Sequence, residues 1–204
     1  MPEAHRENFF IELLKFVLVA AAIVVPVRLF VAQPFIVSGA SMDPTFNNGQ
    51  YLIIDELSYR LHEPERGDVV IFRYPRGPKE FFIKRIVGLP GETVAIRNGV
   101  VYVAKNQGSG SAGIIGNDAF TKLDEPYVVN RGNGADATHP VGQNEYFVMG
   151  DNRPESSDSR IWGMLPRANI IGYAYLRLLP LHKLGIFPGA LGHYSPTDTA
   201  ALPQ

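Results

Sequence analysis

The stretch FFIKRIV at residues 81–87 is an apolar run broken only by Lys84 and Arg85. Successive side chains of a β-strand point to opposite faces of the sheet, so Phe82, Lys84 and Ile86 share one face. Lys84 therefore has an apolar neighbour on each side along the strand. A short apolar run that ends at a Pro-Gly turn signal is typical of a buried strand.

Further runs of this kind lie on both sides of the stretch. Turn signals separate them, and Asn98-Gly99 is the strongest hairpin signal in the chain. Glycine (20 residues) and proline (16 residues), in a chain rich in Val, Ile, Tyr and Phe, favour many short strands joined by turns. The predicted fold class is mainly β, with strands at residues 51–55, 68–73, 81–87, 93–97, 100–104, 127–129, 146–149 and 170–179.

The composition excludes several classes of protein. With 19 basic and 20 acidic residues the net charge is -1, and no basic block indicates nucleic acid as a partner. The lack of cysteine excludes disulfides, cysteine nucleophiles and zinc-thiolate sites. The sequence has no phosphate-binding loop and no metal-ligand spacing, so we expect no cofactor and no metal ion. Its 204 residues suffice for one domain with a smaller lobe or an anchor.

The N-terminal part of the chain is strongly apolar. Residues 16–27 are an unbroken apolar run, and residues 13–32 are interrupted only by Lys15 and Arg28 near the two ends. About 20 residues span a bilayer, and both cations can reach the headgroups, so we predict a transmembrane helix at residues 13–32. A buried core helix is one alternative. A cleavable signal peptide is disfavoured, because no small residue stands three positions before a cut after Ala32.

The positive charges predict the orientation of this helix. Arg6 and Lys15 lie towards its N-terminal side, and after Arg28 no Lys or Arg follows until Arg60. The positive-inside rule then puts residues 1–12 in the cytoplasm and all that follows the helix on the outer face. We expect a single-pass protein of the cell membrane.

The rest of the chain divides by composition. Residues 105–143 hold Gly-Ser and Asn-Gly segments, which indicate an insertion between two halves of one core. We predict a main β domain at residues 34–97 and 145–184, an inserted lobe at 98–144 and a loosely ordered tail at 185–204.

Lys84 is the first candidate for chemistry. A desolvated lysine loses much of its preference for the charged form, so its pKa falls from about 10.4, and it can then act as a general base near neutral pH. One alternative is a solvated lysine on the face of a strand. A histidine base is another, although histidines 5, 62, 139, 182 and 193 lie before the helix, in polar loops or near the tail.

Ser41 lies in the stretch GASMDPT at residues 39–45, after the apolar segment. A nucleophilic serine needs a base, an oxyanion donor and small residues that let a substrate approach; Gly39 and Ala40 meet the last need. The backbone N–H of Ser41 is the candidate oxyanion donor. An ordinary turn is the alternative, and the nucleophile-elbow pattern is absent because Asp43 stands where its second glycine would be.

The loop GDNRPESSDSR at residues 150–160 is dense in hydrogen-bonding side chains. It lacks the glycine and the ligand spacing of a calcium loop. Its functional interpretation is a supporting cluster, in which a serine hydroxyl orients the lysine amine and Asp158 pairs with Arg160. An exposed acidic loop is the alternative.

Four blocks lie in order at residues 39–45, 66–70 (Arg-Gly-Asp-Val-Val), 84–91 and 150–160. Together they resemble the type I signal peptidases, membrane-anchored serine proteases that remove signal peptides from exported proteins. The resemblance implies an antiparallel β catalytic domain with a smaller inserted β lobe. It implies cleavage of preproteins after small residues at the outer surface of the membrane, with signal peptides, the lipid bilayer and the protein-export machinery as partners. The likeness covers residues 10–97 and 145–179.

The resemblance also implies roles for particular residues. Ser41 would be the nucleophile, and Lys84 the general base that later protonates the leaving amine. Ser156 would orient the lysine, and Asp158 and Arg160 match a structural pair.

Around the nucleophile the match is less complete. Met42 matches a residue beside the nucleophile. Some members of the family have a serine two residues before the nucleophile as an oxyanion donor, but here that residue is Gly39. The nearest hydroxyl, Ser38, lies three residues before Ser41, so the backbone N–H of Ser41 is the predicted donor.

Two other functions fit parts of the sequence. A Ser/Lys protease of another substrate class, such as a self-cleaving repressor, is similar around the two residues but carries a DNA-binding module where the apolar segment lies here. A non-catalytic anchored β domain that binds a partner predicts a dispensable Lys84 with an ordinary pKa.

Overall fold

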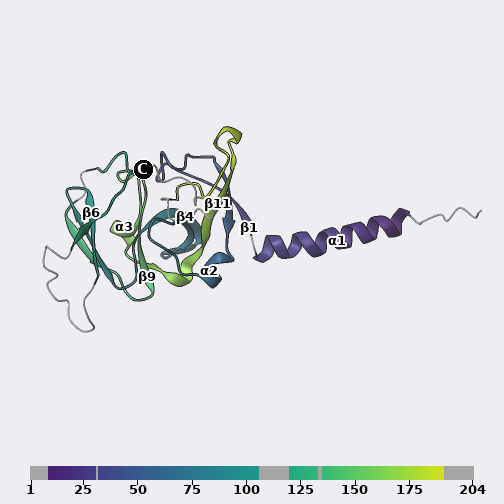
Figure 1. Cartoon of the computed structure of the whole chain (residues 1–204), viewed down its shortest axis with the longest axis horizontal. Coiled ribbons are helices and arrows are strands. Elements are labelled where there is room, and N and C mark those ends of the chain that lie inside the picture. Colours follow the sequence, from purple (N-terminus) through teal and green to yellow (C-terminus); the bar gives the residue numbers. More distant parts are fainter. Residues whose placement is uncertain (1–8, 31, 106–119, 133–134, 191–204) are drawn as a thin grey trace, which may run out of the picture.

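The computed structural model describes residues 9–30, 32–105, 120–132 and 135–190. Most of the described strands form an eight-stranded sheet in the order β1-β2-β11-β3-β4-β9-β10, with β12 paired to β11 (Figure 1). Every pairing in it is antiparallel. Its strands are Ala32–Ile36 (β1), Tyr51–Asp55 (β2), Val69–Tyr74 (β3), Gly77–Gly88 (β4), Glu145–Met149 (β9), Leu165–Pro166 (β10), Ile170–Leu179 (β11) and Gly185–Ile186 (β12).

A smaller antiparallel sheet lies beside the first, in the order β7-β6-β5-β8 (Figure 1). The β5–β6 hairpin turns at Asn98 and Gly99, which both have positive φ, as a two-residue hairpin turn requires. The predicted hairpin and the predicted β fold class are confirmed. The strands are Glu92–Arg97 (β5), Val100–Lys105 (β6), Thr121–Lys122 (β7) and Ala137–Pro140 (β8).

Short helices occupy some of the connections between strands. The α-helices are Ser58–Leu61 (α2) and Ser159–Trp162 (α3). The 3-10 helices are Arg167–Asn169 (η2) and Leu181–Lys183 (η3).

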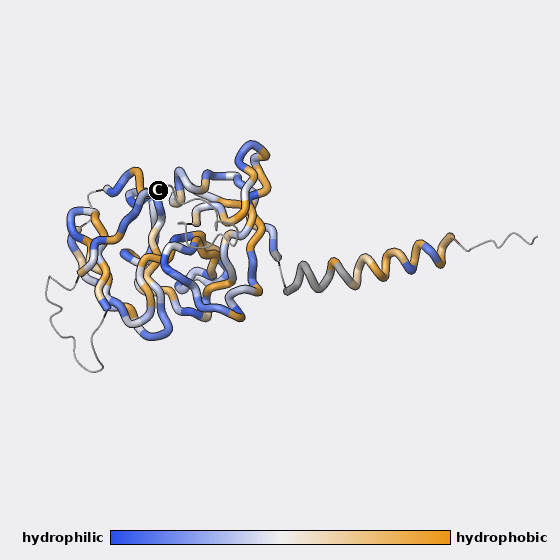
Figure 2. The backbone as a smooth tube through the Cα atoms, viewed as in Figure 1, coloured by the Kyte–Doolittle hydropathy of each residue, from blue (hydrophilic) through white to orange (hydrophobic). Residues whose placement is uncertain are grey.

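The second half of β4, residues 83–88, is buried between the flanking strands β3 and β9. The side chains of β4 alternate as the sequence predicts: Phe82 and Ile86 pack in a cluster with Val70, whereas Ile83 packs in another cluster with Met42. A third cluster joins the two sheets through β5, β6 and β9. Figure 2 shows the same pattern, with apolar residues on the strands inside the β body and polar residues on many of the loops around it.

Helix α1 (Phe9–Phe30) precedes β1 and extends away from the β body (Figure 1). Phe16, Val17, Leu18 and Val19 are all exposed. Successive residues of a helix point about 100° apart, so these side chains cover every direction around it. Within the described residues, no helix is both long enough and apolar enough to cross a membrane.

Several predicted boundaries are wrong. The helix expected at residues 13–32 begins at Phe9 and ends at Phe30, and Ala32 instead pairs with Asp55 in β1. The smaller sheet begins at Glu92, not at residue 98, because β5 pairs with β6 and β8.

Two further predictions are corrected. The strand expected at residues 127–129 is absent, because the chain there turns and places the Tyr127 ring under a buried arginine. The tail expected to be loose from residue 185 starts with β12, which pairs with β11. Residues 1–8 and 191–204, where the cytoplasmic end and the rest of the tail were predicted, lie outside the described residues.

Candidate active site

Ser41 lies in the irregular segment between β1 and β2. Met42 and Phe46, which belong to the apolar core, anchor the segment on either side of the exposed Pro44. Gly39 has a φ of +93°, a conformation that L side chains rarely adopt, so a glycine is needed there. Met42 and Phe46 therefore hold in place the turn that directly follows Ser41.

The loop that follows β9 holds this segment from the other side. The backbone N–H of Asn152 donates to the carbonyl of Ser41 at 3.1 Å, and its side-chain amide donates to the carbonyl of Ala40 at 3.1 Å. Thr45 Oγ1 donates to Asp151 Oδ2 at 2.5 Å. Two blocks that are far apart in the sequence, residues 39–45 and residues 150–160, therefore form one unit.

Lys84 comes from the centre of β4 and is 4% exposed. Its Nζ donates to Ser41 Oγ at 2.7 Å and to the carbonyl of Ile83 at 2.9 Å. The Phe82 ring lies 5.3 Å from the amine. The predicted burial of Lys84 is confirmed, and its side chain meets the hydroxyl of Ser41.

Burial lowers the pKa of Lys84 to about 8, although the charges of Asp158 and Asp151 oppose the shift. Both hydrogen-bond partners of the amine are neutral oxygens, so neither replaces the hydration of an ammonium ion with a full opposite charge. An amine with this pKa is partly unprotonated near neutral pH. It can then accept the proton of the Ser41 hydroxyl, which lies within hydrogen-bond distance.

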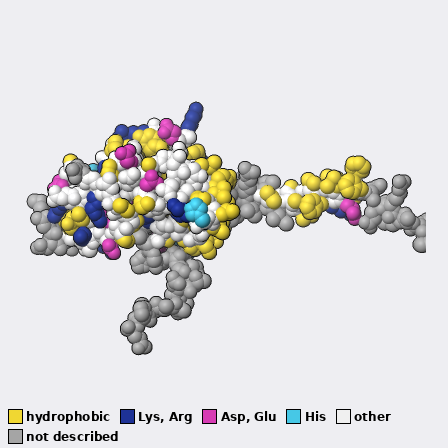
Figure 3. Space-filling view, turned by 90° about the horizontal axis from the view of Figure 1, so that it is seen from above, with side chains coloured by type: hydrophobic (Ala, Val, Ile, Leu, Met, Phe, Trp, Pro, Cys, Tyr) yellow, Lys and Arg dark blue, Asp and Glu magenta, His cyan; other side chains and the backbone are white. Residues whose placement is uncertain are grey.

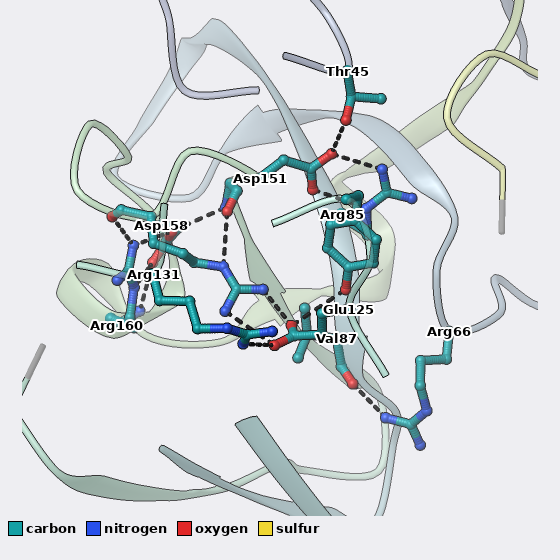
Figure 4. Close-up of polar contacts among 12 residues, drawn as sticks. Thr45, Arg66, Arg85, Val87, Glu125, Arg131, Asp151, Asp158 and Arg160 are labelled. Carbon is teal, nitrogen blue, oxygen red and sulfur yellow. Dashed lines mark hydrogen bonds and ion pairs between the residues drawn. The ribbon is translucent and has the colours of Figure 1, made fainter. Parts of the chain in front are cut away.

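Arg85, the next residue, is completely buried and is fully paired (Figure 4). Its Nε and Nη2 donate to the two carboxylate oxygens of Asp151 at 2.8 and 2.7 Å. Its Nη1 donates to the carbonyls of Gly67 and Gly189. Because Asp151 also accepts from Thr45, this ion pair links β4 to the segment that carries Ser41.

The other predicted site residues lie around this unit. Asp158 forms the predicted ion pair with Arg160 at 2.8 Å and accepts from the backbone N–H of Gly150 at 3.0 Å. Ser156 is buried, but its Oγ has no hydrogen-bond partner among the described residues. Met42 is a core residue, and Ser38 is exposed. Across the described residues, no group of His, Asp and Glu is arranged to hold a metal ion.

A family model described as signal peptidase, peptidase S26, matches residues 10–179 of the chain. The chain belongs to the signal peptidase family. Two relatives from Synechocystis sp. are named probable signal peptidase I-2, which is 35% identical over 90% of this chain and 80% of the relative, and probable signal peptidase I-1, which is 34% identical over 87% of each. The signal peptidase I of Aquifex aeolicus is 31% identical, over 74% of this chain and 77% of its own.

A solved structure of a signal peptidase I from Enterococcus faecalis V583 is 31% identical, with a TM-score of 0.43 over 55% of this chain and 97% of its own. The assignment to the family rests on the sequence matches. The protein is accordingly an enzyme, a serine peptidase of the signal peptidase family.

Sequence reasoning missed the contacts of Glu125 and Tyr127, which lie in the described residues 120–132. Glu125 is buried and pairs with Arg153 and Arg131, and the Tyr127 ring lies 4.0 Å from the guanidinium of Arg85 (Figure 4). Burial and the neighbouring Glu125 raise the pKa of the Tyr127 hydroxyl above its usual range. Single charged and aromatic residues in a Gly- and Asn-rich segment give no periodic signal, so only the fold connects them to the loop after β9.

Proposed function

We propose that this protein cleaves signal peptides from exported preproteins after small residues, with Ser41 as nucleophile and Lys84 as general base. The observation that carries the proposal is the 2.7 Å contact between Lys84 Nζ and Ser41 Oγ. A serine hydroxyl is a weak nucleophile and needs a nearby base to remove its proton. The lowered pKa of Lys84, about 8, makes its amine such a base near neutral pH.

The reaction then proceeds in two halves. The neutral amine of Lys84 takes the proton as Ser41 Oγ attacks the scissile carbonyl, and the ammonium ion then protonates the leaving amine of the mature protein. The released amine carries the proton away, and a water molecule activated by the same lysine hydrolyses the acyl-enzyme. Ser156 would orient the lysine, because its buried Oγ has no partner and can accept from the ammonium ion.

The backbone N–H of Ser41 is the proposed donor to the oxyanion. The N–H of Gly39 already donates to Asn48 Oδ1 at 2.9 Å, which leaves it less suited to this task. The Ser38 side chain is exposed and has no assigned role in the proposal. Asp158 and Arg160 would keep the loop after β9 in place, since Asp158 holds the backbone of Gly150.

The substrate would bind extended, with its backbone along strand edges near Ser41. Val37, Met42 and Ile83 belong to the apolar cluster at this point, and Phe35 packs against it half-buried. An apolar contact surface here would favour small apolar side chains before the cleaved bond.

The proposal includes attachment to the cell membrane through α1, with the N-terminus in the cytoplasm and the β body on the outer face. Its support is the set of exposed apolar side chains of α1, among them Phe16, Val17 and Leu18, and Figure 3 shows apolar side chains along the face of the helix turned to the viewer. The test is co-sedimentation with vesicles of phosphatidylethanolamine and phosphatidylglycerol. The full chain should sediment with the vesicles, and a chain that begins at residue 32 should bind at least about tenfold more weakly.

The catalytic proposal is tested by incubating the full chain in detergent with a preprotein and sequencing the new N-terminus. The wild-type protein should cut after a small residue, and Ser41→Ala should lose cleavage while it keeps its unfolding temperature. Ser157→Ala is the matched control, because Ser157 is an exposed serine of the same loop as Ser156. Turnover by Ser41→Ala at the wild-type rate would exclude Ser41 as the nucleophile. A cut at an unrelated sequence would point to a protease of another substrate class.

A further inference from the structure

A hollow of about 410 Å³ lies between the smaller sheet and the loop after β9. Arg131, Arg153 and Arg160 line it, together with His139 from β8. Among the described residues, none of those that line the hollow is Asp or Glu. Its walls therefore bring positive charge together without an acidic side chain at the surface of the hollow.

The positive charge is only partly balanced from behind these walls. The Glu125 carboxylate is shared by Arg153 and Arg131, so a single negative charge faces two guanidinium groups (Figure 4). Asp158 balances Arg160. Burial lowers the pKa of His139, which keeps that ring neutral. Among these named side chains one formal positive charge remains, and Arg131 is the most exposed of the three arginines, with a side chain that is 34% exposed.

The hollow borders the loop after β9, which in turn contacts the segment that carries Ser41. Ser156, which lines the hollow, is 6% exposed, and its Oγ has no hydrogen-bond partner among the described residues. Gly150 lies between Ser156 and the nucleophile: a Cβ built on Gly150 would collide with both Ser156 Oγ and the Ser41 carbonyl oxygen. Ser156 and Gly150 thus connect the hollow to the segment that carries Ser41.

Two regions near Ser41, the apolar cluster and the hollow, differ in chemistry. The apolar cluster with Val37, Met42 and Ile83 suits the small residues that precede the cleaved bond. The hollow is cationic and too large for a small apolar side chain, so it suits the residues on the other side of the bond.

We infer that this hollow is a subsite for an acidic residue in the first few positions after the cleaved bond, with Arg131 as the group that binds its carboxylate. The inference rests on the proposed function. Arg131 can do this without losing Glu125, since a guanidinium has five N–H donors and only its Nη1 contacts that carboxylate. Arg153 would keep Glu125 paired, so the fold does not depend on Arg131 alone.

The test compares synthetic signal-peptide substrates that are identical except for Glu, Gln or Lys at the first, second or third position after the cut. The full chain in detergent should cleave the Glu peptide with a kcat/KM about tenfold above that of the Gln peptide at one of these positions, and the Lys peptide should be the poorest. Arg131→Gln should bring the Glu-to-Gln ratio close to one, and Arg131→Lys should retain most of it. Lys79→Gln, on the exposed start of β4, is the control and should keep the wild-type ratio.

Equal rates for the Glu and Gln peptides, a ratio that Arg131→Gln leaves unchanged, or a preference confined to residues before the cut would each overturn the subsite. Binding of the same labelled peptides to Ser41→Ala, measured by fluorescence anisotropy, separates this inference from the proposed function. Tighter binding of the Glu peptide through Arg131, without any cleavage by the wild-type protein, would support the subsite and overturn the proposed function. Cleavage that needs Ser41, with equal binding of the Glu and Gln peptides, would support the proposed function and overturn the subsite.

Discussion

Each face of strand β4 buries a cation, but the two cations have different kinds of hydrogen-bond partner. On one face Lys84 is 4% exposed and donates to a hydroxyl and a carbonyl. On the other face Arg85 is 0% exposed and donates to both oxygens of the Asp151 carboxylate. Burial alone therefore does not decide whether a cation stays charged.

The difference lies in the partners and in the chemistry of the two side chains. A buried ammonium with neutral partners loses hydration without a compensating charge, so its pKa falls and it becomes a base. A guanidinium keeps its proton, and a carboxylate in contact balances its charge. The face with Lys84 is suited to proton transfer, and the face with Arg85 is suited to holding the loop that carries Asp151 against the Ser41 segment.

Lys84→Met should produce the largest effect, a loss of kcat of about 10³-fold or more, because methionine fills the space of the lysine stem but cannot accept a proton. The unfolding free energy at pH 7 should not fall, since the variant no longer buries a charged amine. Peptide cleavage and chemical denaturation measure both. Lys79→Met, from the exposed part of the same strand, should retain activity. A Lys84→Met enzyme with wild-type kcat would refute a role of Lys84 as the base.

Asp151→Ala should lower the unfolding free energy by about 3–5 kcal/mol, because it leaves the buried Arg85 charge without its carboxylate. Urea denaturation at pH 7 measures the change. Asp124→Ala is the control, because Asp124 is exposed; it should change the unfolding free energy by less than about 0.5 kcal/mol. A loss below about 1 kcal/mol for Asp151→Ala would show that the Arg85 pair matters little to stability.

The pH dependence of stability should report Lys84 directly. Its pKa is about 8 in the folded protein against an ordinary value of 10.5, so between these pH values the unfolded chain binds more protons. The unfolding free energy of the wild type should therefore rise, relative to Lys84→Met, by up to about 3 kcal/mol from pH 8 to pH 10.5. A constant difference between the two proteins across that range would contradict a lowered pKa.

The same pKa sets the pH dependence of cleavage. Only the neutral amine of Lys84 can take the Ser41 proton, so kcat/KM should rise about tenfold per pH unit below pH 8 and level off above it. A series of initial rates at low substrate concentration measures this profile. A profile that is flat from pH 6 to pH 9 would assign the base to a different group.

Glu63→Ala should have the smallest effect of these variants, because its ion pair is exposed whereas the pair of Arg85 and Asp151 is buried. Glu63 pairs with Arg167 at 3.0 Å, but its side chain is 79% exposed. Water screens such a pair, so the loss of unfolding free energy should be below about 1 kcal/mol. Similar losses of unfolding free energy for Glu63→Ala and Asp151→Ala would mean that burial does not decide how strongly these ion pairs stabilise the fold.

Much of the fold could be predicted from local patterns. Period-two alternation correctly placed Phe82, Lys84 and Ile86 on one face of β4, and Asn98-Gly99 correctly marked the β5–β6 hairpin. Local patterns failed where pairing over a long distance decides the structure. Residues 127–129 look like a strand but turn, because Tyr127 packs on Arg85.

Some features of the candidate site could likewise be predicted from local patterns, and others could not. The burial of Lys84 followed from its strand, and the ion pair of Asp158 and Arg160 was expected from the many polar side chains of their loop. Ser156 was expected to contact the lysine, and in the structure its Oγ has no partner. Glu125 had no signal, because a buried charge is recognisable only from the partners that surround it, and Tyr127 was predicted only as part of a strand.

The sequence by itself determined the β class, the apolar environment of Lys84 and the membership in the signal peptidase family, since each depends on residues that are close in the chain or matched in order. Only the tertiary structure decided that Lys84 meets Ser41, that Arg85 has a carboxylate partner while Lys84 has none, and that Arg131 and Arg153 share one carboxylate beside a hollow. The physical reason is that charge balance inside a protein depends on atoms a few ångströms apart, which the fold brings together from distant parts of the chain.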